Sequence, residues 1–547
     1  MNSNQSTDTT SDNPLEHLIA IGIELSSEKD TTKILEHILL SAKSITHADG
    51  GTIYSITPEH TLKFETLLND TLDMYLGGTT DKPINFPTIP LYIDDQPNKK
   101  ALVALAAATN TVVNIEDAYE VEQYDMTGAR NMDKQTGYRT KSVLTIPMTN
   151  HDGDINGVMQ LINAQDSDGN VISFSKEKEH LIRTLASLAA IALTNRQLID
   201  GMEELFQSIT RLIAKAIDEK SPYTGGHCRR VPELTLMIAD AVHDTNQGPL
   251  ADFAMSEADR YELSIAGWLH DCGKIAIPEA VMDKATKLGM LFDRIELVDC
   301  RIELAQRDLT VAMQQDIITA LKAGDHAKVV QLEQNCEQKL SELDQDREFL
   351  RKANIGGEYM PPQAQQRVAD IGHKYQVMIG GESQPMISSG EVYNLQVAKG
   401  TLTEEERRLI NHHMDITIEM LETLPFPKHL KNVPEYAGGH HEKMDGTGYP
   451  RGLKRDEMSV QARLMAIADI FEALTASDRP YKKAKPISEC LFIMGKMKLD
   501  NHIDPDLFDI FVDHKVYQQF ADAFLDDSQI DEVDISKIPG YLPLAER

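Results

Sequence analysis

The run His440-His-Glu-Lys-Met-Asp-Gly-Thr-Gly-Tyr-Pro450 places two adjacent histidines before a carboxylate and a turn with two glycines. Adjacent histidines rarely suit a hydrophobic core, because each ring carries a donor and an acceptor that must be satisfied. Neutral imidazole is, however, the commonest protein metal ligand. The glycines allow backbone turns and a close approach of the backbone to a ligand. The run therefore indicates a metal site beside a tight turn.

Three further segments carry residues of the same kind. His227 follows a Thr-Gly-Gly turn, His270 directly precedes Asp271, and Asp469 lies inside the apolar run Met465-Ala-Ile-Ala-Asp-Ile-Phe471. A buried carboxylate must be paired or bound to a metal. Without a metal, His270 and Asp271 would be a hydrogen-bonded pair at the surface, and His227 would be an isolated histidine. Four such segments in one chain favour a shared metal centre.

Together these segments resemble the HD-GYP family of metal-dependent phosphohydrolases. The resemblance is carried by residues 221–231, 268–274, 440–450 and 466–474, and by Arg479-Pro-Tyr-Lys482. It implies a helical domain that hydrolyses cyclic dinucleotides, chiefly cyclic di-GMP. Hydrolysis of a phosphodiester is served by two metals about 3.5–4 Å apart that stabilise the attacking and leaving oxygens.

The resemblance implies two divalent ions that share Asp271. One ion would be held by His227, His270, Asp271 and Asp469, and the other by Asp271, His413, His440 and His441. Imidazole and carboxylate ligands together suit Fe or Mn.

His412 competes with His413 for a place in the second set. The family frame Ile-x-x-His, with a Leu eight residues after the His, selects His413 through Ile410 and Leu421. Tyr223 stands where some relatives carry the Glu of a third metal site, so a dinuclear centre is expected.

The resemblance also implies the substrate contacts. Lys274, Arg479 and Lys482 would contact phosphate, and Gly448 and Tyr449 would line the substrate pocket. Lys274 lies one helical turn after His270, so both can face one site. Lys274 and Asp271 are the expected catalytic residues. The alternative for Arg479 and Lys482 is that both are solvated surface charges.

The N-terminal part has a different character. Across residues 15–175, short apolar runs separated by polar turns predict an antiparallel sheet with helices. Residues 136–148 and 157–164 resemble a GAF sensory domain. The expected fold is therefore multidomain: an α+β GAF domain linked by a long helix to an all-α HD-type metallohydrolase domain.

Some GAF domains that bind cyclic nucleotides carry a Lys–Asp pair within a five-residue motif. Asn163, Phe174 and Glu179 match that motif, but Ala164 replaces the Lys and Lys178 replaces the Asp. A sensor for an unknown small ligand and a structural or dimerising domain are therefore both open.

A long helix is expected over residues 176–218. Six apolar residues alternate by four and three, which is the spacing of a coiled-coil seam: Leu198, Met202, Leu205, Ile209, Leu212 and Ala216. This predicts a parallel homodimer. The alternative is an apolar face that docks on its own domain.

The HD-GYP domain is expected over residues 219–525, with an insertion at about 290–399. Two antiparallel helices joined at Gly324 are expected there, followed by a loop over residues 354–389. The insertion would cover the active site, build an interface, or do neither. Residues 1–14 are expected to be a disordered leader and residues 526–547 an acidic tail.

Composition limits the class of protein. The net charge of −32 over 547 residues argues against nucleic-acid binding, which needs Lys and Arg to neutralise phosphates. No apolar run approaches the roughly 20 residues that span a bilayer, so no membrane partner is expected. Five dispersed cysteines without a Cys-x-x-Cys pair favour the reduced cytoplasm.

The leading hypothesis is a GAF-regulated phosphodiesterase that opens a 3′–5′ bond of cyclic di-GMP or cyclic GMP-AMP, giving the linear dinucleotide or GMP. A receptor that binds the dinucleotide and signals through protein contacts is the alternative of a different class. A general HD-domain nucleotidase is the third.

Overall fold

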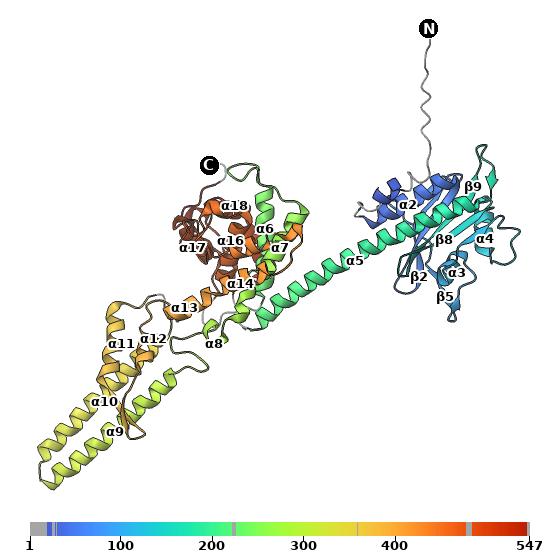
Figure 1. The fold of residues 1–547 in the computed structure, drawn as a ribbon. Helices are drawn as coiled ribbons and strands as arrows, with labels where there is room; N and C mark the ends of the chain where they lie inside the picture. Colours follow the sequence, from blue (N-terminus) through green and yellow to red (C-terminus); the bar gives the residue numbers. More distant parts are fainter. Residues whose placement is uncertain are drawn as a thin grey trace. The chain divides into compact units, whose positions relative to one another are not determined.

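The computed structural model describes residues 19–24, 28, 30–220, 226–357, 359–476 and 484–543, and divides the chain into two compact units, Met1–Leu205 and Phe206–Arg547 (Figure 1). The expected leader, residues 1–14, lies outside the described residues, as do residues 544–547 of the expected tail. No helix of the described part is both long and apolar enough to span a membrane.

The first unit is built on an antiparallel sheet with the order β3-β2-β1-β9-β8-β7. These strands are β1 (Ala48–Ile56), β2 (Thr61–Asn69), β3 (Met74–Gly77), β7 (Val113–Ile115), β8 (Val143–Thr149) and β9 (Ile155–Gln165). Two short strands, β4 (Ile89–Pro90) and β10 (Val171–Ile172), extend the sheet to eight. A separate pair is formed by β5 (Tyr92–Ile93) and β6 (Gln96–Pro97).

The two faces of this sheet are covered by different helices, because successive side chains of a strand point to opposite faces. Ile53 and Met159 pack with α2 (Thr31–Thr46) and the first part of α5 (Lys176–Lys220). Tyr54 and Val158, their neighbours in sequence, pack on the other face with α3 (Leu102–Thr109). Helix α4 (Thr127–Thr136) also lies on that side, where Met126 and Ala129 contact the sheet residue Val143.

The residues of the partial cyclic-nucleotide motif have structural partners. Asn163 has a left-handed backbone (φ 55°), and its side chain accepts from the Lys141 N–H at 2.7 Å. Lys178 donates to the Thr46 carbonyl at 2.7 Å, and Glu179 accepts from Asn114 at 2.8 Å. Lys178 therefore holds the start of α5 against the end of α2.

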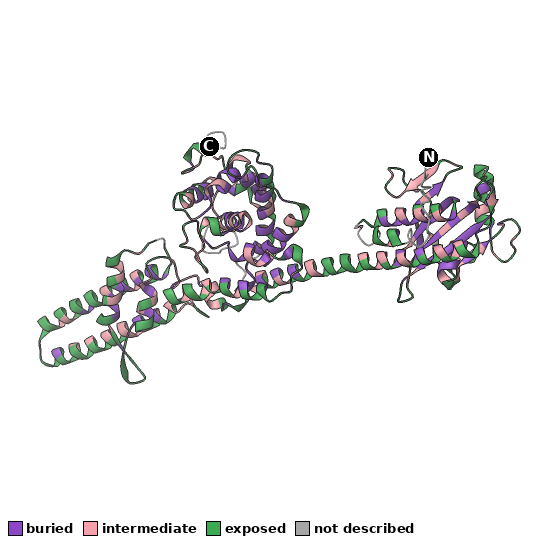
Figure 2. Cartoon of the chain, turned by 45° about the horizontal axis from the view of Figure 1, so that its top comes forward, coloured by how far each residue is buried: buried purple, intermediate pink, exposed green. Residues whose placement is uncertain are grey.

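Helix α5 is continuous over 45 residues. Leu185 and Leu193 are buried in the first unit, and Ala214 and Ile217 belong to the core of the second. Between them lies an exposed apolar stripe, visible as the exposed middle of the helix in Figure 2: Leu198, Met202, Leu205, Ile209 and Leu212, which are 46–70% exposed. Among the described residues nothing covers this stripe.

The second unit is helical. Its central helices are α6 (His227–His243), α7 (Glu257–Leu269), α14 (His413–Glu422), α15 (Val433–Gly438) and α16 (Val460–Thr475). They are followed by α17 (Ile487–Leu499), α18 (Pro505–Asp513) and α19 (Val516–Phe524). Phe471 on α16 packs edge-on against Phe511 and Phe520, which fixes α16 at the centre of the core. The α+β and helical parts agree with the predicted fold class.

The insertion has its own core. It follows α8 (Glu279–Met282), contains α9 (Ile295–Lys322) and α10 (His326–Asn354), and leads to α13 (Glu404–Asn411). The chain turns between α9 and α10 at Gly324 (φ 73°), as the spacing predicts. Val298, Leu343 and Leu350 are among the residues buried in this core.

The prediction of a loop over residues 354–389 is wrong. This segment forms α11 (Pro362–Lys374), β11 (Gln376–Ile379), β12 (Glu382–Pro385) and, from Ser389, α12 (Ser389–Leu395). Gly380 and Gly381 both have positive φ and join β11 to β12 in a two-residue turn, which is a recognisable hairpin signal. Val368 and Val377 are buried against the helix pair, so sparse apolar residues suffice to order the segment.

Candidate metal centre

Five chain segments converge at the start of α6, the end of α7, the start of α14, the loop after α15 and the middle of α16. Their histidine and carboxylate atoms form two groups in which all ligand atoms lie within 4.8 Å of one another. The first group is His227, His270 and Asp271, and the second is Asp271, His413, His440 and His441. Asp469 adds an oxygen 3.3 Å from His227 Nε2 and 3.9 Å from His270 Nε2. The structure thus brings together all seven residues predicted as ligands.

Three of the imidazole rings are oriented by the same kind of hydrogen bond. His270, His413 and His440 each hold Nδ1 within 2.6–2.7 Å of a backbone carbonyl three residues earlier in the chain. Since a carbonyl only accepts, Nδ1 carries the proton and donates it. The Nε2 lone pair of each ring then faces the centre, which is the orientation that metal-ligating histidines adopt.

His227 is oriented by a carboxylate instead. Its Nδ1 lies 2.5 Å from Glu472 Oε2, and Arg230 donates to the other oxygen of Glu472 at 2.7 Å. Glu472 is 1% exposed, and although burial alone would raise its pKa, His227 and Arg230 hold the pKa well below its usual range. A carboxylate behind a ligating histidine fixes the ring and raises its basicity.

The buried donor atoms fit bound cations. Asp271 Oδ1, His413 Nε2 and His440 Nε2 are buried without a hydrogen-bond partner. Burial and the neighbouring rings of His441 and His270 lower the pKa of His440 far below its ordinary value, so the ring is neutral and can ligate. Burial would raise the pKa of Asp271, but Lys274 and His270 hold it well below its ordinary value. A neutral His440 ring beside an ionised Asp271 offers donors of the kind that divalent ions need.

Lys274 lies on the short 3-10 helix η1 (Cys272–Ala276). Its Nζ is 2.5 Å from Asp271 Oδ2, so it contacts the carboxylate common to both groups. Gly273 lets this turn approach α14, since a Cβ there would lie 2.0 Å from the His413 carbonyl oxygen. The Gly273 N–H also donates to Thr417 at 2.9 Å. The close contact of η1 with α14 therefore requires glycine at position 273.

Glu442 organises the glycine-rich turn. Its carboxylate is 1% exposed and accepts the backbone N–H groups of Arg451, Gly452 and Leu453 at 2.7–3.1 Å. This holds the chain so that the Tyr449 ring stacks on His441, with centroids 4.9 Å apart and 24° between the planes. Gly448 and Tyr449 therefore lie beside the centre.

His412 lies apart from these groups. Its side chain is 57% exposed and its Nδ1 is 2.8 Å from Asp415, whereas His413 is 2% exposed. Tyr223 and the two predicted phosphate contacts Arg479 and Lys482 lie outside the described residues.

Two residues of the centre were not predicted. Glu472 and Arg230 each lie three residues after a predicted ligand, at Asp469 and His227. On a helix, that spacing places a side chain on the same face one turn along. The three-residue spacing from a predicted ligand was the sequence feature that could have identified both residues.

Glu472→Gln is expected to weaken metal binding by about 10–100-fold, the usual cost of removing the carboxylate behind a ligating histidine. The amide keeps the shape of the side chain but loses the charge that faces His227 and Arg230. Metal affinity measured by competition with a chelator tests this. Glu489→Gln, at a glutamate outside the centre, is the matched control, and equal affinities of the two variants would contradict the assigned role of Glu472.

Comparison with known proteins agrees with the division of the chain into an α+β unit and a helical unit. The family described as GAF domain matches residues 30–193, and that described as HD domain matches residues 386–507. The chain therefore carries a GAF domain followed by an HD domain. The HD match includes His413, His440, His441 and Asp469.

Named relatives share parts of the chain. The "3′3′-cGAMP-specific phosphodiesterase 3" of Vibrio cholerae is 46% identical over 303 residues, which are 55% of this chain and 37% of the relative. The "Cyclic di-GMP phosphodiesterase" of Thermotoga maritima is 34% identical over 129 residues, 23% of this chain and 33% of the relative. The matched part of this chain thus spans about a third of either relative's length. A solved GAF domain of an Acinetobacter phosphoenolpyruvate-protein phosphotransferase aligns with 35% of this chain and 97% of its own, at 16% identity and a TM-score of 0.26.

Proposed function

We propose that this chain, in which a GAF domain precedes an HD domain, is a metal-dependent phosphodiesterase of cyclic dinucleotides. The observation that carries the proposal is the position of Asp271 in two adjacent groups of buried ligand atoms. Two divalent ions held there, Fe or Mn, would polarise the phosphoryl group and make a nucleophile available at neutral pH.

The side chains of the site would hold the metal ions and bind the substrate. Asp271 joins the two ligand groups, and the other six predicted ligands complete them. Lys274, 2.5 Å from Asp271, would turn its ammonium to the substrate phosphate, where a cation is a strong partner. Tyr449, stacked on His441, would contact a base or sugar of the substrate. Arg479 and Lys482 are kept as candidate phosphate contacts on the resemblance alone.

The substrate is proposed to be cyclic di-GMP or cyclic GMP-AMP. Similar enzymes are named for each of these dinucleotides, and the longer alignment is with the enzyme named for cyclic GMP-AMP. The product would be the linear dinucleotide or GMP. The five free cysteines suit work in a reducing cytoplasm.

The test is anaerobic incubation of protein containing Fe or Mn with each dinucleotide, followed by chromatography of the products. Cleavage of either substrate that is lost in His440→Ala and retained in His412→Ala would support the proposal. Metal-loaded protein that cleaves neither dinucleotide would overturn it. Tight binding without cleavage would then favour the receptor alternative.

We also propose that α5 forms a parallel homodimer seam through its exposed apolar stripe. Leu205→Asp is expected to shift the protein from dimer to monomer, because a carboxylate in a coiled-coil seam is strongly disfavoured. Sedimentation velocity measures the change. Ser208→Asp introduces the same charge off the stripe and should leave the dimer intact. A wild-type monomer at micromolar concentration would contradict the seam. Such a dimer is a route by which the GAF domain would regulate turnover.

A further inference from the structure

The last turn of α5 contacts two of the chain segments that form the metal centre. Helix α5 ends at Lys220, and Ala214 and Ile217, one and two turns earlier, are buried in the core of the helical unit. This end of the helix is therefore docked in that unit. One segment that it contacts is the start of α6, which carries His227, and the other is η1, which carries Lys274.

The ammonium group of Lys220 is directed at the backbone of η1. Its Nζ donates to the Lys274 carbonyl at 3.2 Å, to the Ile277 carbonyl at 2.7 Å and to the Ile275 carbonyl between them. An ammonium has three N–H donors, so the three carbonyls match all of them. The Nζ of Lys274 in turn lies 2.5 Å from Asp271 Oδ2. Lys220 thus holds the backbone from which the Lys274 side chain reaches the metal centre.

The sequence explains why the end of η1 needs a donor from outside. Pro278 has no N–H, so it cannot donate to the Ile275 carbonyl in the pattern of a 3-10 helix. The side chains of Ile275 and Ala276 are exposed and do little to fix this end of the turn. At the start of η1, the Gly273 N–H donates to Thr417 on α14. The turn is therefore held by α14 at its start and by α5 at its end.

A second side chain of the same turn of α5 contacts α6. Gly226 is the N-cap of α6 and has no side chain that could accept from the free N–H groups there. The Asp218 carboxylate accepts the Gly226 N–H at 3.1 Å and the Cys228 N–H at 3.4 Å. A carboxylate is favourable at this end of a helix. Because His227 lies between these two residues, α5 also supports the segment that presents this candidate ligand.

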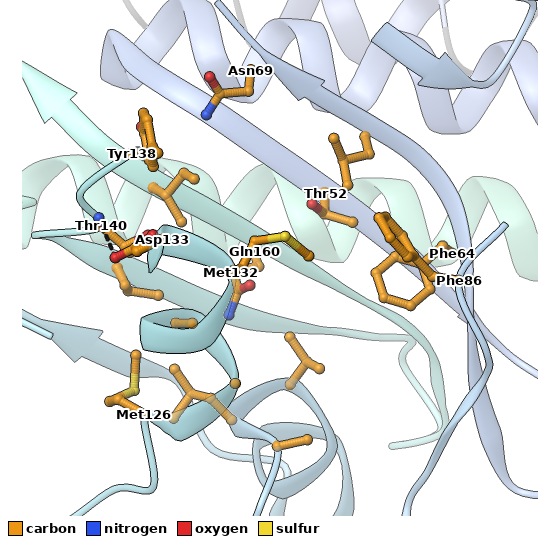
Figure 3. Close-up of a pocket in the computed structure, with 18 of the residues that line it drawn as sticks. Thr52, Phe64, Asn69, Phe86, Met126, Met132, Asp133, Tyr138, Thr140 and Gln160 are labelled. Atoms are coloured by element: carbon orange, nitrogen blue, oxygen red, sulfur yellow. Dashed lines mark hydrogen bonds between the residues drawn. The ribbon is translucent and has the colours of Figure 1, made fainter. Parts of the chain in front are cut away.

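Helix α5 belongs to the GAF domain as well. Its first part packs on one face of the GAF sheet, and a cavity of about 360 Å³ lies on the opposite face, among Phe64, Met132 and Gln160 (Figure 3). From there α5 continues without a break over 45 residues. Rigid secondary elements and hydrogen-bond networks carry coupling between distant sites. A displacement of α5 would therefore reach the metal centre through Asp218 and Lys220.

We propose that Lys220 is a positioning residue of the metal centre, through which α5 sets the place of the Lys274 ammonium. The proposal rests on the proposed function and deepens it, because Lys274 is the group that would meet the substrate phosphate. Lys220 acts on backbone carbonyls of η1, so removal of its charge leaves the candidate ligands in place.

Hydrogen exchange measured by mass spectrometry tests this contact without a substrate. In Lys220→Met, the amides of residues 272–277 should exchange about tenfold faster than in the wild type, because the turn loses hydrogen-bonded support. Lys215→Met removes an exposed lysine of the same helix and should leave this exchange unchanged. Trp268, the single tryptophan of the chain, lies beside Arg211 of α5, so unchanged fluorescence shows that α5 stays docked.

Unchanged exchange in Lys220→Met would overturn the proposal. If that variant fails to fold, Lys220→Gln takes its place with the same expectations, because its amide is one bond shorter and cannot span three carbonyls.

Steady-state kinetics tests whether Lys220 acts through Lys274. Lys220→Met should lower kcat about tenfold, the effect of a lost hydrogen-bonded support, with unchanged metal content and little change in KM. In a Lys274→Met background the same substitution should have no further effect, because the two residues act as one unit. A tenfold loss in both backgrounds, or loss of metal from Lys220→Met, would overturn the proposal. A wild-type protein that cleaves neither dinucleotide would overturn the proposed function instead, and hydrogen exchange alone would then decide the role of Lys220.

Discussion

Asp271→Asn is expected to lower kcat/KM for the cyclic dinucleotide by at least about a thousandfold, since metal ions contribute several kcal/mol of transition-state stabilisation. The substitution keeps the size of the side chain and removes its charge. Asp271 Oδ2 lies 3.1 Å from Nε2 of both His227 and His270, and Oδ1 lies 3.3 Å from His413 Nε2. One neutral amide would therefore weaken both ligand groups together.

Asp415→Asn provides the control, because that carboxylate is exposed and faces His412 outside the centre. Metal analysis and steady-state kinetics on both variants separate the outcomes. Asp271→Asn with reduced metal content and Asp415→Asn with wild-type content and turnover are expected. Wild-type turnover by Asp271→Asn would remove the central residue of the proposed function.

Lys274→Met is expected to lower kcat by about 100–1,000-fold, the usual cost of losing one charged or polar group aimed at a developing oxyanion. Methionine preserves most of the aliphatic stem. Burial would lower the pKa of Lys274, but Asp271 and Asp469 raise it above its ordinary value, so the ammonium is charged throughout the neutral range. Lys274→Met therefore removes a positive charge at the edge of the metal centre.

Metal content distinguishes this effect from that of Asp271→Asn. Lys274→Met should retain its metal, because an ammonium does not ligate, while turnover falls. Lys431→Met, an exposed lysine of the same unit, should behave as wild type. Loss of metal from Lys274→Met would show that the lysine acts by holding Asp271 and not by contacting the substrate.

The sequence predicted best where a motif combines chemistry with fixed spacing. The ligand residues come from five segments, yet each segment carries its own local signature, such as the His-Asp-x-Gly-Lys turn that needs Gly273 for its contact with α14. Glu472 was missed because a lone glutamate on a helix is usually a solvated side chain, and its burial against His227 depends on how α6 meets α16. The segment after Asn354 was misjudged because glycines and prolines suggested a loop. In the structure Gly380 and Gly381 form the turn of a hairpin, and Pro361 and Pro362 are the N-cap and first residue of α11.

The arrangement of the centre along the chain has a thermodynamic consequence. Its candidate ligands begin at His227 and end at Asp469, and the whole insertion lies between Asp271 and His413. A ligand that binds only the native state raises its stability by mass action, and an ion that joins distant segments also closes the long loops between them. The GAF domain has a core of its own and contributes none of these residues. A cell short of metal would thus hold a chain whose helical unit is less stable than its metal-loaded form and opens more often to proteases, so metal supply would govern how long that unit stays folded.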